Sequence, residues 1–167
     1  FINNHWNNQK LIIAPHEIKP ENITRLKGLF PDSILFSEIS SSQSPVNSYR
    51  VLIIDNIGYL SRLYKYASVC YVGGGFNKSG HHNILEAAVY GKPVITGPNF
   101  QKFKESVDLK KLKGSFAIEN AHELKQVMLT MNIEEEGKIA ENYVKVNGGA
   151  TDTIFNWLQE KRLFTNA

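Results

Sequence analysis

The sequence predicts an α/β fold: a doubly wound, mostly parallel sheet with helices on both of its faces. Two observations lead to this prediction. About six short apolar segments alternate with segments whose apolar residues recur at helical spacing. Three glycines, Gly73, Gly74 and Gly75, directly follow one of the apolar segments, where a strand would turn into a loop. In sheets of this class, ligands bind outside the carboxyl ends of the strands.

The composition bounds the kind of protein. The 167 residues suffice for one domain with a sizeable core, and 42% hydrophobic with 21% charged residues is ordinary for a soluble globular protein. No apolar run approaches the roughly 20 residues that a membrane-spanning helix needs. The net charge of +3 is small and the lysines are scattered, which favours an anionic small ligand over a nucleic acid. Cys70, the single cysteine, excludes an internal disulfide and is expected to be a buried thiol.

The chain is expected to be a piece of a longer protein. It begins with Phe1, and residues 1–9 lack the basic start and the apolar core of a signal peptide. We expect residues 1–167 to form a single domain, with residues 132–167 as a C-terminal helical extension.

The first half of the chain is expected to alternate strands with helices. Apolar runs predict strands at residues 11–14, 33–36, 51–54 and 69–72. Pro20 is typical of a helix start and predicts a helix over residues 20–30, and helical spacing predicts another over residues 58–67. The serine-rich residues 37–48 are expected to be an exposed loop.

The second half continues this alternation and then ends in helices. A helix over residues 83–90 should end at Gly91, followed by a strand that ends before Pro98. Asn120 and Glu123 have the spacing of a capping box that opens a helix reaching Met131. The remaining expected elements are a helix over residues 105–113, a strand over 115–118, and helices over 134–145 and 151–161.

The glycine loop matches neither of two familiar phosphate-binding motifs. The dinucleotide motif G-x-G-x-x-G would need glycine where the chain has Lys78. A P-loop that begins at Gly75 would reach Gly80 correctly, but Lys and Ser or Thr must follow, and the chain has His81 and His82. A general anion site remains, in which N–H groups of the loop and of a helix N-terminus bind a phosphate. A plain tight turn is the alternative, but three adjacent glycines exceed what one turn requires.

Several polar side chains near the loop allow two interpretations. Glu86 lies three residues after Asn83, which fits a capping pair and equally a carboxylate that accepts hydrogen bonds from a ribose. His16, after the first strand, either donates to an anion or is an ordinary loop residue. His81 and His82 are adjacent, so their side chains diverge, and no metal site is expected.

Three segments resemble the C-terminal half of the transferases of 3-deoxy-D-manno-octulosonic acid (Kdo). They are APHEI from Ala14, IIDNIGYLSRLYKYA from Ile53, and VGGGFNKSGHHNILEAAVYGKPVITGPNFQKFKE from Val72. This family moves the acidic sugar Kdo from CMP-Kdo onto lipid A precursors. LEAAVYGKPVI is also similar to many nucleotide-sugar transferases of the GT-B class, whereas HNILE followed by GKPVITGPNFQKF narrows the resemblance to Kdo transferases.

The resemblance implies a Rossmann-like domain that binds the donor, facing a second such domain across a cleft. The absent N-terminal domain would hold the acceptor and the catalytic base. No catalytic residue is therefore expected here, and the chain alone should bind without turnover. The residues expected to bind the nucleotide sugar are His16, Asn56, Ile57, Gly73, Gly74, Gly75, His82, Asn83 and Glu86.

The chain departs from the family at two points. Many members have Arg immediately before the histidine matched by His16, where this chain has Pro15, and Lys19 or Lys78 is expected to supply the cation instead. The family often has Asp-Thr-Met-Gly-Glu where this chain has Asp-Asn-Ile-Gly-Tyr at residues 55–59, so the polar role of the fifth position is in question.

The charges favour an anionic donor over the donors of retaining GT-B hexose transferases. Those enzymes have paired glutamates eight positions apart, whereas Lys78 stands eight positions before Glu86. Lys78, His81, His82 and Lys102 would complement the phosphodiester and the sugar carboxylate of CMP-Kdo. No Asp-x-Asp occurs, in agreement with a site that uses no metal and no cofactor.

The mechanism expected from the resemblance is inverting transfer. An acceptor hydroxyl, deprotonated by a carboxylate of the absent domain, would attack the anomeric carbon of Kdo while this domain stabilises CMP. The rivals are a GT-B domain for a UDP-sugar, a nucleotide-binding module without catalysis, and a purely structural domain.

The full-length protein is expected on the cytoplasmic side of the bacterial inner membrane, with a lipid A precursor as partner. The helix around Trp157 is expected to pack against the absent domain rather than on a membrane.

Overall fold

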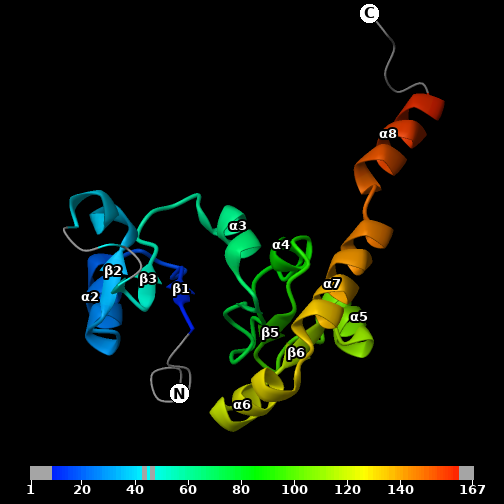
Figure 1. Ribbon diagram of the computed structural model, residues 1–167. Coiled ribbons are helices and arrows are strands. Elements are labelled where there is room, and N and C mark those ends of the chain that lie inside the picture. The colour runs from blue at the N-terminus through cyan, green and yellow to red at the C-terminus, as the bar shows by residue number, and fades with distance from the viewer. Residues whose placement is uncertain (1–8, 43–44, 46–47, 162–167) are drawn as a thin grey trace, which may run out of the picture. The chain divides into compact units, whose positions relative to one another are not determined.

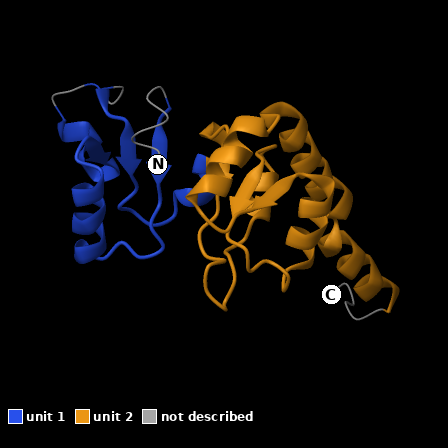
Figure 2. Ribbon diagram, turned by 90° about the horizontal axis from the view of Figure 1, so that it is seen from below, with its two compact units in different colours: residues 1–63 blue, residues 64–167 orange. Residues whose placement is uncertain are grey.

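The computed structural model describes residues 9–42, 45 and 48–161 (Figure 1). The chain divides into two compact units, residues 1–63 and 64–167, which Figure 2 shows in different colours. Each unit contains a three-stranded sheet in which all the described pairs are parallel. The predicted α/β class with parallel strands is confirmed, while the assignment of the whole chain to one domain with a helical extension stays a prediction.

Unit 1 is built on the strand order β1-β3-β2. Val51 in the central strand lies between Leu11 and Ser33 of its two neighbours. Buried aliphatic side chains of the second and third strands, such as Ile34 and Ile53, form its core. The elements of this unit are β1 (Leu11–Ile13), α2 (Pro20–Leu29), β2 (Ser33–Leu35), the 3-10 helix η1 (Phe36–Ser41), β3 (Val51–Ile53) and α3 (Leu60–Leu63).

The expected loop over residues 37–48 is wrong at its beginning, where η1 forms. Glu38 stabilises this turn, since its Oε2 accepts a hydrogen bond from the Leu35 N–H at 3.2 Å. The Ser41 hydroxyl donates to the Glu38 carbonyl at 3.1 Å. Serine side chains that bond to nearby backbone groups favour such short turns. Residues 43–44 and 46–47 of the expected loop lie outside the described residues.

Unit 2 is built on the strand order β4-β5-β6. Cys70 pairs with Val94, and Val94 pairs in turn with Ser115. The elements of this unit are η3 (Tyr64–Tyr66), β4 (Cys70–Tyr71), α4 (Leu85–Ala88), β5 (Val94–Thr96), α5 (Lys104–Leu112), β6 (Ser115–Ala117), α6 (Ala121–Thr130), α7 (Ile133–Asn147) and α8 (Ala150–Glu160).

Helix α7 is part of the core of unit 2. Ala140 is fully buried in a cluster whose other members are Cys70, Val72, Ile84, Ala87, Ala88, Val94 and Leu109. One turn earlier, a Cβ added to Gly137 would lie 2.3 Å from the carbonyl oxygen of Gly91. Only glycine permits this close approach, so that α7 packs with its backbone against the turn that precedes β5.

Two expected helices are shorter than predicted because their ends tighten. The helix expected over residues 58–67 is α3 followed by the single 3-10 turn η3, an ordinary way for an α-helix to end. The helix expected over residues 83–90 is the single turn α4. Past it, Tyr90 and Gly91 donate to the carbonyls of Ala87 and Ala88, three residues back, and Gly91 takes a φ of 66°.

The predicted cap of α6 at Asn120 is confirmed, while Glu123 reaches the N–H of Glu119 and not that of Asn120, as a full capping box would require. Asn120 Oδ1 accepts a hydrogen bond from the Glu123 N–H at 3.0 Å, while Glu123 Oε2 accepts from the Glu119 N–H at 2.8 Å. These bonds satisfy two N–H groups at the start of the helix, so residue spacing alone located this boundary.

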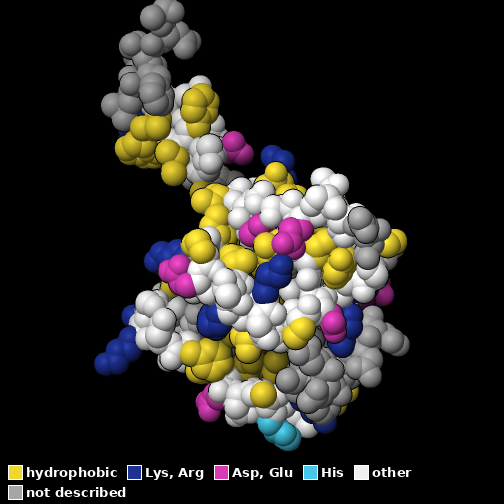
Figure 3. All heavy atoms as spheres, turned by 90° about the vertical axis from the view of Figure 1, so that its left-hand side faces the viewer, with side chains coloured by type: hydrophobic (Ala, Val, Ile, Leu, Met, Phe, Trp, Pro, Cys, Tyr) yellow, Lys and Arg dark blue, Asp and Glu magenta, His cyan; other side chains and the backbone are white. Residues whose placement is uncertain are grey.

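Helix α8 buries none of its residues, although Ile154 and Trp157 are large and apolar. Figure 3 shows hydrophobic side chains over the helical end next to the grey C-terminal residues. Gly148 and Gly149 separate α8 from α7, and Gly149 takes a φ of 89°. Among the described helices, none combines the length and the apolar character needed to cross a membrane.

Candidate functional site

The glycine loop of unit 2 leaves the carboxyl end of β4 and returns to it. Gly74 and His81 form an antiparallel bridge, and the His82 N–H donates to the Gly73 carbonyl at 3.1 Å. Residues 74–81 therefore form a closed loop, which lies at the edge of the sheet where parallel α/β folds bind ligands.

Three glycines of this loop are required by its shape. Gly74, Gly75 and Gly80 have φ of 87°, 77° and 89°, a region that other residues rarely adopt. Gly75 also crosses Gly97, which follows β5: a Cβ on Gly75 would lie 2.9 Å from the Gly97 Cα, and a Cβ on Gly97 would lie 2.6 Å from the Gly75 carbonyl carbon. The two backbones touch directly, so that the loop is fixed to the end of β5.

Gly73 differs from these three glycines. Its φ is outside the left-handed region, and nothing lies within 4 Å of a Cβ built on it. It is also exposed, unlike Val72 before it. Neither conformation nor packing requires glycine here, so the open space above its backbone is available to a ligand.

The segment after β5 holds the tip of the loop through three hydrogen bonds. The Asn99 N–H donates to the Gly75 carbonyl at 2.9 Å, and its side-chain Nδ2 donates to the Asn77 carbonyl at 3.0 Å. The Lys102 ammonium donates to the Lys78 carbonyl at 2.7 Å. Asn77 adds an internal bond, because its Oδ1 accepts from the Ser79 N–H at 3.1 Å. The tip of the loop is thus ordered although its side chains are exposed.

The structure corrects the prediction that His81 adds positive charge to a donor site. Its side chain is only 7% exposed, and its ring stacks against Phe103 with centroids 4.6 Å apart. Nδ1 lies 2.6 Å from the His82 carbonyl, so Nδ1 carries a hydrogen and donates, and Nε2 lies 2.9 Å from the Ser106 hydroxyl. Both ring nitrogens are used inside the protein, and His81 ties the end of the loop to α5.

Glu86 and Asn83 are in contact, but not as a capping pair, since the N-cap of α4 is Ile84 and it has no side-chain cap bond. Asn83 Oδ1 accepts a hydrogen bond from the Leu85 N–H at 3.0 Å, and Asn83 Nδ2 donates to Glu86 Oε1 at 3.3 Å. Within the described residues, Glu86 Oε2 accepts no hydrogen bond. The ribose interpretation therefore stays a prediction, since one oxygen of the half-buried carboxylate remains available.

Tyr64 is a neighbour of Glu86 that the sequence did not indicate. It belongs to η3, packs against the core cluster of unit 2, and lies on an element that contacts α4. Burial, with the nearby Glu86 carboxylate and then Cys70 as further causes, raises the pKa of Tyr64 to about 12. The hydroxyl therefore stays protonated and able to donate. The helical spacing of residues 58–67 did not indicate this role, because spacing carries no information about what the hydroxyl of a tyrosine contacts.

The remaining predicted residues of unit 2 are exposed around the loop. Lys78 and His82 are exposed, and so is Asn83 at the start of α4. Together with Gly73, Gly74, Gly75 and Glu86, they lie on the continuous segment that runs from β4 to α4. The structure therefore brings together the predicted residues of this unit.

The predicted residues of unit 1 lie in two places within that unit. His16 lines a shallow pocket of about 320 Å³ beside α2, together with Ile13, Pro15, Glu17, Asn22, Arg25 and Leu26. Lys19 pairs with Glu17 at 2.8 Å on the surface. Asn56 and Ile57 follow β3, and the Ile57 side chain is 85% exposed. Arg25 supplies a guanidinium in the same pocket as His16. The sequence did not indicate it, because Arg25 belongs to α2 and not to the segment around Pro15.

Asp55, which matches the family pattern, has a structural role in unit 1. Its Oδ1 accepts a hydrogen bond from the Ser37 N–H at 3.0 Å, and its Oδ2 accepts one from the Ser37 hydroxyl. These bonds connect the end of β3 to the first residues of η1, so the carboxylate orders this edge of the sheet.

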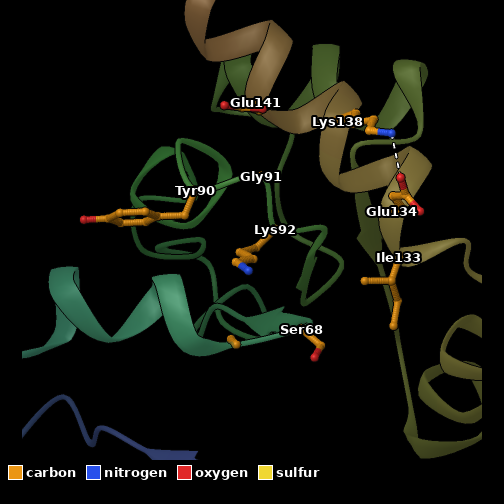
Figure 4. A pocket seen from close by; sticks show the side chains of 9 residues that line it. Ser68, Tyr90, Gly91, Lys92, Ile133, Glu134, Lys138 and Glu141 are labelled. Carbon is orange, nitrogen blue, oxygen red and sulfur yellow. Dashed lines mark hydrogen bonds and ion pairs between the residues drawn. The ribbon is translucent and has the colours of Figure 1, made fainter.

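A pocket of unit 2 lies away from the glycine loop. It has a volume of about 390 Å³ and is lined by Ala67, Ser68, Tyr90, Gly91, Lys92, Ile133, Glu134, Lys138 and Glu141 (Figure 4). Ser68 and Lys92 precede β4 and β5, whereas the glycine loop follows β4, so the pocket is at the opposite edge of this parallel sheet. Glu134 is paired with Lys138 at 2.7 Å. We place the candidate site at the glycine loop, since ligands of α/β sheets bind at the carboxyl edge.

Comparison with known proteins gives a consistent set of relatives. No family model matches the chain. A 3-deoxy-D-manno-octulosonic acid transferase of Aquifex aeolicus is 28% identical over 161 residues, which is 95% of this chain and 44% of the relative. The enzyme of the same name from Chlamydophila psittaci is 33% identical over 95 residues. A bifunctional glycosyltransferase/methyltransferase of Fusobacterium nucleatum is 26% identical over 133 residues, or 77% of this chain and 20% of the relative.

The fold has a close counterpart among solved structures. The C-terminal CMP-Kdo binding domain of WaaA from Acinetobacter baumannii matches with a TM-score of 0.64 and 19% identity, over 83% of this chain and 90% of that domain. The chain spans less than half the length of the curated relatives described above. The comparisons therefore confirm that this chain resembles the C-terminal domain of 3-deoxy-D-manno-octulosonic acid transferases.

Proposed function

We propose that this chain is the donor-binding half of a glycosyltransferase that transfers Kdo from CMP-Kdo to a lipid A precursor in lipopolysaccharide biosynthesis. The observation that carries the proposal is the glycine loop at the carboxyl edge of the β4-β5-β6 sheet, with Gly73 open and exposed. The names of the relatives, whose alignments cover up to 95% of this chain, support the choice of sugar and nucleotide.

The loop supplies the chemistry that a phosphate needs. Within the described residues, no acceptor takes the N–H groups of Gly73, Gly74, Phe76, Asn77 and Lys78. Backbone N–H groups without an internal partner bind anions well, and the Lys78 ammonium adds a positive charge nearby. In this proposal they hold the phosphate of CMP and stabilise it as it leaves.

The ribose and the sugar would be held beside the phosphate. Glu86 Oε2 would accept a hydrogen bond from a ribose hydroxyl, and Asn83 would keep the carboxylate in place through its bond to Oε1. His82, exposed at the end of the loop, would contact the Kdo portion of the donor. His16 stays a predicted nucleotide-binding residue of unit 1, where it lines a pocket together with Arg25.

The rest of the reaction would belong to a part of the enzyme outside this chain. We propose inversion at the anomeric carbon, with an acceptor hydroxyl deprotonated by a carboxylate of an N-terminal domain. Contact with the cytoplasmic face of the bacterial inner membrane, where the lipid acceptor would be met, is proposed for the full-length protein.

A second candidate is a glycosyltransferase domain for another nucleotide sugar. The similarity to the Fusobacterium glycosyltransferase/methyltransferase over 77% of the chain is the observation in its favour. The glycine loop would bind a phosphate in either case, so the nucleotide base distinguishes the two.

Titration of the chain with CMP and with UMP, followed by backbone amide NMR, tests the proposal. We expect CMP to bind at least tenfold more tightly and to shift the signals of residues 73–86. Preference for UMP or UDP would favour the second candidate. Shifts confined to other segments, or no binding of either nucleotide, would remove the glycine loop as the donor site.

A further inference from the structure

We propose that Lys102 and Asn99 are positioning residues of the glycine loop: they hold its backbone in the conformation that binds the donor phosphate without touching the donor. The inference rests on the proposed function, because it states how the loop is presented to the nucleotide. It departs from the charge-based prediction, in which Lys102 itself would face the anion.

The bonds of these two residues go to backbone carbonyls of the loop. Asn99 reaches the carbonyls of Gly75 and Asn77, at 2.9 and 3.0 Å, and Lys102 reaches that of Lys78 at 2.7 Å. Three of the four carbonyls between residues 75 and 78 are therefore directed toward the segment 99–102. Residues 76–79 at the tip of the loop are exposed, so burial of their side chains does little to order the tip.

The direction of each carbonyl also sets the direction of the next N–H group, because the peptide bond is planar. In a planar trans peptide, the carbonyl of one residue and the N–H of the next point in opposite directions, and the described chain contains no cis peptide bond. Because the Gly75 and Asn77 carbonyls point toward segment 99–102, the N–H groups of Phe76 and Lys78 point away from it. These N–H groups have no acceptor within the described residues. Asn99 therefore fixes two donors for an anion on the outer side of the loop, and Lys102 holds the next peptide, between Lys78 and Ser79. We call these two residues together the clamp.

The Lys102 ammonium is better placed to hold the loop backbone than to bind the donor phosphate directly. A charged donor at 2.7 Å from a carbonyl makes one of the stronger hydrogen bonds of a protein surface. A direct contact with the phosphate would have to compete with this bond. Asn99 carries no charge, so an effect of its side chain on anion binding would act through the loop alone.

The test compares four variants of the 167-residue chain. Lys102→Met removes the donor and the charge, Lys102→Arg keeps both, and Asn99→Ala removes only the side-chain donor. Lys111→Met is the matched control, since Lys111 is an exposed lysine of α5 without a bond to the loop. Three quantities are measured: hydrogen exchange of the bonded amides of Ser79 and Gly80 without ligand, the Kd for CMP at several salt concentrations, and the midpoint of thermal unfolding.

We expect exchange of the hydrogen-bonded amides of Ser79 and Gly80 to accelerate at least fivefold in Lys102→Met and Asn99→Ala, and their Kd for CMP to rise about three- to tenfold. The unfolding midpoint and the salt dependence of binding should stay as in the parent chain, while Lys102→Arg and Lys111→Met remain within twofold. Unchanged exchange in both clamp variants would overturn the inference. A flatter salt dependence in Lys102→Met alone would also overturn it, because it indicates direct contact with the phosphate.

The inference and the proposed function fail in different ways. If the parent chain does not bind CMP, the proposed function falls, and the exchange of the Ser79 and Gly80 amides in the ligand-free variants still decides whether Lys102 and Asn99 order the loop. If the parent chain binds CMP and the exchange does not change, the clamp falls and the proposed function stands.

Discussion

Gly73 and Gly74 are neighbours in the chain with different reasons to be glycine. Gly74 needs its φ of 87°, and a Cβ there would lie 2.5 Å from the Gly80 carbonyl oxygen. Gly73 has ordinary φ and empty space around it. An alanine scan of this pair therefore separates folding from binding.

We expect Gly73→Ala to leave the free energy of unfolding within about 0.5 kcal/mol of the parent chain, since no contact is broken. It should weaken CMP binding at least tenfold, because the added methyl occupies the space that a ligand would use. Gly74→Ala should instead lose about 1–3 kcal/mol of stability through backbone strain. Urea unfolding and calorimetric titration with CMP measure the two effects. Full CMP affinity in Gly73→Ala would exclude close approach of the ligand to this residue.

Tyr64 should make the stability of the protein depend on pH in the alkaline range. Burial first, and the Glu86 carboxylate second, raise the pKa of Tyr64 from 10.0 to about 12. Between these values the unfolded chain releases the proton while the folded chain keeps it, so stability falls as pH rises from about 10 to 12. Below pH 10 both states are protonated and the effect vanishes.

Urea unfolding at pH 9 and pH 11 checks this dependence in the parent chain and in Tyr64→Phe. The variant should lose less stability over this interval than the parent, and its titration followed by absorbance at 295 nm should lack the ionisation of Tyr64 at a pKa of about 12. Tyr66→Phe is the control, because Tyr66 is 70% exposed and lies two residues after Tyr64 in η3. Equal pH dependence in the parent chain and in Tyr64→Phe would contradict the burial of this hydroxyl.

At the scale of elements, local sequence signals located most boundaries and missed the contacts that shorten them. The cap at Asn120 located the start of α6, because cap and helix lie within four residues. The tight end of α4 depends on Gly91 and on the approach of α7, which begins more than 40 positions later. Helical spacing cannot register such a long-range contact, so it predicted a helix of two turns where one turn forms.

The packing of α7 on the turn before β5 gives a prediction at this scale. Gly137→Ala should destabilise the protein by about 1–3 kcal/mol, because the new methyl would lie 2.3 Å from the Gly91 carbonyl oxygen. Helical Gly28→Ala is the control: nothing lies within 4 Å of its Cβ, and it should gain about 0.5–1 kcal/mol from helix propensity. Unfolding followed by circular dichroism measures both. A gain in stability for Gly137→Ala would contradict the close backbone contact.

For the whole molecule, the sequence predicted the class of the fold better than the roles of individual residues, and the location of the donor site stays a prediction. Alternating periodicity and the glycine run are local features, and the structure confirms the parallel α/β class that they indicate. The role of His81 was wrong because its burial depends on Phe103 and Ser106, which join it from another element. Asn99 lies inside a segment that carries the family resemblance, yet its bonds to the loop follow only from the crossing of Gly75 over Gly97.

The proposed division of labour leads to a prediction for catalysis. The purified chain should bind CMP and yet transfer no Kdo when it is given CMP-Kdo and a lipid A precursor, because the acceptor and the catalytic base would belong to another domain. Product formation is followed by mass spectrometry of the lipid, with a full-length Kdo transferase as positive control. Sustained turnover by this chain would show that it carries a catalytic base of its own.

The crossing of Gly75 over Gly97 also constrains how this protein can change over evolutionary time. A side chain at either position meets backbone atoms of the other within 3 Å, so neither position can accept a single substitution while both backbones keep their course. Drift at one position therefore requires a rearranged loop. Among homologous chains, those that lack glycine at one of these sites should also differ in the length or the path of the segment between β4 and α4.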